Sequence, residues 1–127
     1  MLNPFLSSAK ARFADKSEIL DIARQTAHRI AVLHPEVHRI LLFGSFARED
    51  YGTRSDLDLL IVLDHSDRPA NERVADFLRC ASNYPTDMLV LTQAELESRL
   101  AAGDPFLGRV VRESIPLYPV PAEGCHP

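Results

Sequence analysis

The stretch Leu41–Leu63 constrains the fold of this chain more than any other part of the sequence. It contains two short apolar runs, each typical of a strand that is buried on both faces. Gly44-Ser45 ends the first run, and residues 45–50 suit a short helix. Asp56 and Asp58 interrupt the start of the second run. We therefore predict a strand, a Gly-Ser turn into a short helix, and a second strand that carries both aspartates.

Helices and further strands are predicted around this stretch from hydrophobic spacing and from start and stop signals. His34-Pro35 ends the first long helix, because the residue before proline is disfavoured in the α region. Thr92 with Glu95 forms a T-x-x-E capping box, which predicts a helix start. The predicted helices span residues 15–33, 69–81, 93–101 and 106–111. The predicted strands span residues 40–43, 57–63, 87–91 and 115–118, the last one at a sheet edge because it contains a proline.

These elements predict a small α/β (α+β) domain in which helices pack around a mixed sheet of three to four strands. Two of the helices have apolar stripes that should face the core. The stripes lie in residues 19–33 of the first helix and at Val74, Phe77, Leu78 and Ala81 of the second, whereas Phe106, Leu107, Val110 and Val111 suit one more short helix.

The length of 127 residues fits one domain, which we place at residues 1–118. Residues 119–127 are rich in proline and are expected to form a disordered tail. The net charge of −4 argues against direct nucleic-acid binding, which needs a basic surface. Two scattered cysteines, no secretory signal and no apolar run of about 18 residues are typical of a protein of the reducing cytoplasm, away from membranes.

The two aspartates of the second strand are the strongest candidates for chemistry. Asp56 and Asp58 are two residues apart, so on a strand both side chains leave the same face, with Cα atoms roughly 6.5 to 7 Å apart. Buried like charges at this spacing repel each other unless a cation neutralises them. Mg²⁺ prefers such oxygen ligands. Asp87, which begins the next strand, is expected to be the third ligand if the two strands are neighbours.

The Gly44-Ser45 turn is a candidate phosphate site. Glycine lets backbone amides approach a phosphate closely, and the N-terminus of a helix favours negative charge. Arg48 and Arg54 are cations near the same loop and could stabilise a leaving pyrophosphate. Taken singly, each feature also has an ordinary structural explanation, such as a tight turn or a solvated arginine. Their combination favours a site, because a purely structural account leaves charges in an apolar strand without a named partner.

The same residues carry a family resemblance. Gly44-Ser45, ten intervening residues and Asp56-x-Asp58 match the GS-x10-D-x-D signature of the nucleotidyltransferase superfamily that includes DNA polymerase β. The longer string GSFAREDYGTRSDLDLLIVL resembles the minimal nucleotidyltransferases, the MntA-type antitoxins of prokaryotic toxin–antitoxin pairs. The strand that begins at Asp87 and the PFLGRVVRESIPLY ending are also similar. One departure is Glu49, where many relatives have glycine.

The resemblance implies a polymerase β-like fold and a Mg²⁺-dependent reaction with ATP. Asp56 and Asp58 would bind two Mg²⁺ ions, with Asp87 completing the metal site and helping to activate the attacking hydroxyl. Gly44-Ser45, with Arg48 nearby, would hold the triphosphate, and pyrophosphate would leave. The family's antitoxins transfer AMP to a tyrosine of a HEPN-domain toxin, which here would be a separate polypeptide in a possible hetero-oligomer.

Two other functions remain open. One is a non-catalytic binding module that neutralises its partner by contact, which the extra negative charge of Glu49 favours. The other is a transferase for a small molecule such as an aminoglycoside, for which 127 residues leave little room for a substrate domain.

Overall fold

The computed structural model describes residues 16–44, 47, 56–81 and 84–120. Four strands form one sheet in the order β3-β2-β1-β4. Strand β1 (Val37–Phe43) is antiparallel to β2 (Leu57–Leu63) and to β4 (Ile115–Tyr118), whereas β2 is parallel to β3 (Thr86–Thr92). The predicted mixed sheet is therefore confirmed, with β4 at an edge as its proline requires.

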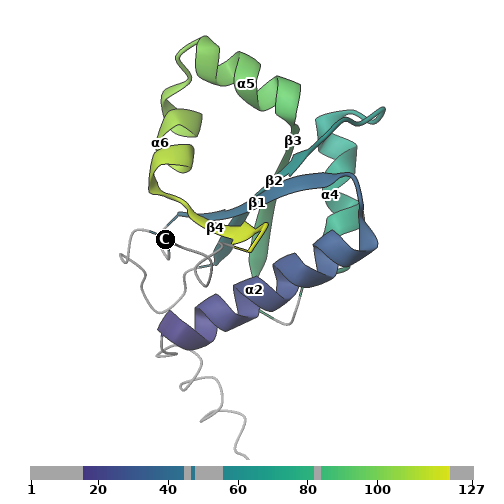
Figure 1. Ribbon diagram of the computed structural model, residues 1–127, viewed down its shortest axis with the longest axis vertical. Helices are drawn as coiled ribbons and strands as arrows, with labels where there is room; N and C mark the ends of the chain where they lie inside the picture. The colour runs from purple at the N-terminus through teal and green to yellow at the C-terminus, as the bar shows by residue number, and fades with distance from the viewer. Residues whose placement is uncertain (1–15, 45–46, 48–55, 82–83, 121–127) are drawn as a thin grey trace, which may run out of the picture.

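Within the described ranges, four helices cover the two faces of this sheet (Figure 1). Helices α2 (Lys16–Leu33) and α4 (Ala70–Leu78) pack on one face, and α5 (Gln93–Ala101) and α6 (Pro105–Glu113) pack on the other. Helix α4 makes the crossover that a parallel pair such as β2 and β3 needs. None of the helices in the described ranges combines the length and hydrophobicity that crossing a lipid bilayer requires.

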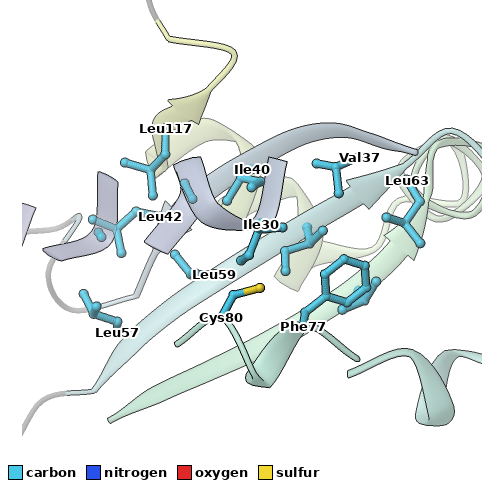
Figure 2. Close-up of a cluster of buried hydrophobic side chains, with 14 of the residues drawn as sticks. Ile30, Val37, Ile40, Leu42, Leu57, Leu59, Leu63, Phe77, Cys80 and Leu117 are labelled. Carbon is cyan, nitrogen blue, oxygen red and sulfur yellow. The ribbon is translucent and has the colours of Figure 1, made fainter. Parts of the chain in front are cut away.

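The larger hydrophobic cluster lies between the sheet and helices α2 and α4. In Figure 2, Ile30 of α2 lies near the strand residues Ile40 and Leu59, and Phe77 of α4 lies at the Leu63 end of the same cluster. Cys80, which follows α4, is a buried free thiol in the same cluster; Cys125 lies outside the described residues.

The second cluster lies between the opposite face of the sheet and helices α5 and α6. Leu60 and Val62 of β2 meet Leu96 of α5 and Leu107 and Val110 of α6. Because side chains alternate along a strand, odd-numbered residues of β2 face α2 and α4, and even-numbered residues face α5 and α6. This alternation directs Asp58, the polar residue of β2, toward α5 and α6.

Local signals predicted several boundaries correctly. Thr92 Oγ1 accepts a hydrogen bond from the Glu95 backbone N–H at 3.1 Å, and Glu95 Oε1 accepts from the Thr92 N–H at 2.9 Å, which confirms the capping box. Asp104 Oδ1 caps α6 through the Leu107 N–H at 3.1 Å, and Pro105 follows in the first turn.

Other expectations were wrong. Strand β1 begins at Val37, three residues before the expected start at Ile40, because the β1 ladder continues past the apolar run. Leu78 is predicted in the buried stripe of its helix but is 44% exposed. Arg73 takes a buried place in α4 instead, because its guanidinium finds hydrogen-bond partners there. The predicted tail begins at Pro119; its residues 121–127 lie outside the described residues, as do residues 1–15.

Candidate active site

The strand register brings two of the predicted acids together. Asp58, the second residue of β2, is the direct neighbour of Asp87, the second residue of β3. Adjacent strands lie about 4.8 Å apart, so the two backbones bring these carboxylates within reach of one cation. Asp58 lies on the same strand face as Leu60, and Asp87 lies on the same face as Leu89. Both acids therefore face the α5 and α6 side, at the end of the sheet where β2 and β3 begin.

Asp56 lies just outside this pair. The prediction of a strand that carries both aspartates was wrong for Asp56, because β2 begins at Leu57 and the exposed Asp56 directly precedes it. Burial and the negative charge of Asp56 raise the pKa of the Tyr84 hydroxyl, which places that carboxylate near the loop that enters β3. Across the described ranges, no three His, Cys, Asp or Glu side chains gather as a ready metal site. The structure thus pairs Asp58 with Asp87 and leaves Asp56 beside them.

Gly44 follows β1 at the point where its last residue, Phe43, pairs with Asp58. Its φ of +80° is in the left-handed region, which favours glycine. A Cβ atom at this position would lie only 2.1 Å from Asp58 Oδ2. Glycine is therefore required twice, for the backbone conformation and for the close approach of the chain to the carboxylate.

Several predicted site residues cannot be placed. Ser45, Arg48 and Arg54, together with Glu49, lie outside the described residues. Their roles in holding phosphate or in modulating the site therefore remain predictions from the sequence.

A pocket of about 550 Å³ opens beside Gly44 and Asp58. Helix α6 forms its other wall, and the described lining residues are Phe43, Gly44, Asp58, Phe106, Arg109, Val110 and Glu113. The sequence analysis did not single out Phe106, Arg109 or Glu113 as site residues, because residues 106–111 are predicted there only as a short helix. The signal was present: positions 106, 109, 110 and 113 follow helical spacing and form one face of α6.

The donor chemistry fits a divalent cation. Asp58 and Asp87 supply hard carboxylate oxygens from adjacent strand positions, and Asp56 can supply a third from the segment directly before β2. Mg²⁺ takes such ligands and retains positions for water and substrate phosphates. Two neighbouring carboxylates also repel each other, which a bound cation relieves.

Comparisons with known proteins agree with this architecture. A Methanocaldococcus jannaschii protein, provisionally named a protein adenylyltransferase, is 34% identical over 68 residues, which are 53% of this chain and 67% of that protein. The crystal structure of a provisionally assigned nucleotidyltransferase from Sulfolobus solfataricus has a similar fold, with a TM-score of 0.61 and 22% identity over 87% of this chain and 85% of the other. Residues 25–118 match the family described as polymerase beta, nucleotidyltransferase. The chain therefore belongs to the polymerase β-like nucleotidyltransferase family, as the GS-x10-D-x-D signature predicted.

Proposed function

We propose that this nucleotidyltransferase uses Mg²⁺ and ATP to transfer AMP to a hydroxyl group of another protein. The observation that carries the proposal is the registration of Asp58 beside Asp87, with Gly44 packed against the Asp58 carboxylate. This geometry supports a reaction in which phosphate, cation and acceptor meet at the start of β2 and β3. The name of the Methanocaldococcus jannaschii relative supports a protein as the acceptor.

Each residue has a defined task in this proposal. Asp56, Asp58 and Asp87 would hold the metal, which when bound supplies positive charge to the reacting phosphate and the leaving pyrophosphate. Gly44 allows the backbone after β1 to approach the triphosphate, and Ser45 with Arg48 would add donors. Asp87 would accept the proton of the attacking hydroxyl through a carboxylate oxygen. The new bond joins the acceptor oxygen to the α-phosphorus, and the bond to the pyrophosphate oxygen breaks.

The acceptor that we propose is a tyrosine of a separately encoded HEPN-domain toxin, so that the chain acts as an antitoxin. The resemblance of residues 44–63 to minimal nucleotidyltransferases supports this partner. The experiment mixes the chain with the HEPN-domain protein of a neighbouring gene, with ATP and Mg²⁺, and measures the intact mass of that protein. One or more added adenylyl groups on tyrosine are expected.

The matched control is the double variant Asp56→Asn/Asp58→Asn, which should leave the partner's mass unchanged. Equal transfer by this variant and the unmodified chain would contradict the mechanism. If the mass of the HEPN-domain protein stays unchanged with the unmodified chain as well as with the variant, the proposed acceptor is wrong.

Contact inhibition is the second candidate function, and Glu49 is the observation that favours it. An additional carboxylate near the Gly44-Ser45 turn opposes phosphate binding. A contact inhibitor should still protect cells from the toxin after Asp56 and Asp58 are replaced, whereas an enzyme should not. Co-expression of the toxin with the double variant separates the two functions.

A further inference from the structure

We infer that the pocket beside α6 binds the purine base of the nucleotide substrate, with Phe106 as the surface on which the base stacks. The inference rests on the proposed function, because it takes the nucleotide's phosphates to lie at Gly44. It assigns a binding role to Phe106, Arg109 and Glu113, which lie outside the nucleotidyltransferase signature.

The pocket has the size and position that a nucleoside needs. Its volume of about 550 Å³ is within the usual range of ligand sites, roughly 300 to 1,000 Å³. Gly44 and Asp58 belong to its wall, so it is continuous with the place where the reacting phosphate is proposed to lie. A nucleotide held there by its phosphates can extend its sugar and base directly toward α6.

Phe106 provides an aromatic surface on the α6 wall of this pocket. Its ring lies 6.0 Å from that of Phe43, with an angle of 82° between the ring planes. This edge-to-face contact orients Phe106 while 54% of the residue remains exposed. A large aromatic side chain so exposed and yet oriented can stack against a planar base, since every base has a π-face.

The rest of the α6 face has a composition that suits a purine. Val110 is a buried apolar contact, whereas Arg109 and Glu113 are exposed and carry opposite charges. Arg109 and Glu113 are four residues apart, so they lie on one face of the helix. An arginine can donate to a ring nitrogen of the base, and a carboxylate can accept from its exocyclic amino group.

The position of the pocket favours the nucleotide over the acceptor side chain. The sheet order places β1 and β3 on opposite sides of β2. The pocket lies on the β1 side, next to Gly44, whereas Asp87, which would activate the acceptor hydroxyl, is on β3. The acceptor is therefore expected to approach from the β3 side, which leaves the α6 side for the base.

The test compares two probes, ATP and inorganic tripolyphosphate, each with Mg²⁺, in calorimetric titrations of the full chain. Phe106→Ala should raise the Kd of ATP about 5- to 20-fold, as expected for the loss of one partly exposed stacking contact. It should leave the Kd of tripolyphosphate, which has no base, unchanged. Phe106→Tyr keeps an aromatic ring, so this variant should bind ATP with a Kd close to that of the unmodified chain. Val32→Ala, at a position 65% exposed on α2, is the matched control and should change neither Kd.

The outcomes separate the two proposals. If the unmodified chain binds neither probe, the proposed function itself fails, and this inference fails with it. If both probes bind and Phe106→Ala weakens neither, or weakens both equally, the base is not in this pocket although nucleotide binding stands. If Phe106→Ala leaves the Kd of ATP unchanged but raises the KM for the protein acceptor, the pocket belongs to the acceptor and the inference is overturned.

Discussion

Asp58 and Asp87 are direct neighbours on two parallel strands, at the end of the sheet where both strands begin. The crossover through α4 creates this relationship, because it returns the chain to the start of β3 beside the start of β2. Both side chains face α5 and α6. The opposite face of the sheet packs against α2 and α4 in the larger apolar cluster. The acids therefore lie at one end of the sheet face that is opposite the larger core cluster.

Gly44→Ala should reduce nucleotidyl transfer about 10- to 100-fold, because a small displacement of a reacting group has effects of this size. The new Cβ would lie 2.1 Å from Asp58 Oδ2, so the carboxylate must move. The positive φ should add a loss of about 1 kcal/mol in the free energy of unfolding. Transfer assays and urea denaturation measure the two effects.

Gly103→Ala is the matched control for this prediction. Its φ of +83° carries a similar backbone strain, but a Cβ there meets nothing within 4 Å. It should lose about 1 kcal/mol of stability and keep full transfer activity. Equal activity losses in the two alanine variants would show that contact with Asp58 is not the reason for glycine at position 44.

Two adjacent residues at the end of α4 should differ sharply in their importance for stability. Phe77 is 2% exposed in the larger core cluster, so Phe77→Ala should cost about 3 to 5 kcal/mol of unfolding free energy. Leu78 is 44% exposed, so Leu78→Ala should cost less than about 1 kcal/mol. Denaturant titrations of both variants check this, and similar losses would mean that the α4 face is assigned incorrectly.

Acid should destabilise the protein through Glu95. Its bond with the Arg73 guanidinium, with N···O distances of 2.7 and 3.1 Å, is the main cause that lowers the Glu95 pKa from 4.5 to about 2. Because the folded-state pKa is the lower one, the stabilisation is fully present above pH 4.5 and is lost as the pH falls toward 2. Glu95 is 41% exposed, so solvent screening reduces the expected contribution to about 1 to 2 kcal/mol.

The measurement for this prediction is the urea midpoint as a function of pH. Glu95→Gln removes the titrating group and should flatten the part of the acid dependence that this pair causes. Unchanged curves for the variant and the unmodified chain would assign the acid sensitivity to other carboxylates.

The features that the sequence predicted well are those that neighbouring residues determine. Thr92 and Glu95 are three positions apart, and the side chain of each accepts a hydrogen bond from the backbone N–H of the other. The start of α5 can therefore be inferred from neighbouring residues. The adjacency of Asp58 and Asp87 is different, because it depends on which strands pair after a helical crossover. The sequence indicated Asp87 as a candidate metal ligand, but its position beside Asp58 follows only from the sheet order and the strand register.

The burial of Arg73 could not be predicted from hydrophobic spacing. Arg73 is 5% exposed because Glu95 and the backbone carbonyls of Val90 and Arg68 accept its hydrogen bonds. Val90 and Glu95 belong to β3 and α5, which are 17 and 22 residues further along the chain.

The most direct test of the account is the Mg²⁺ dependence of ATP binding in the double variant Asp58→Asn/Asp87→Asn, measured by calorimetry. Asp64→Asn is the control, since Asp64 directly follows the other end of β2, where its carboxylate lies 3.3 Å from His38. We predict that the unmodified chain and Asp64→Asn bind ATP tightly and only with Mg²⁺. The double variant should bind ATP at least about tenfold more weakly, and Mg²⁺ should no longer change its affinity. Mg²⁺-dependent binding of undiminished affinity in the double variant would contradict it.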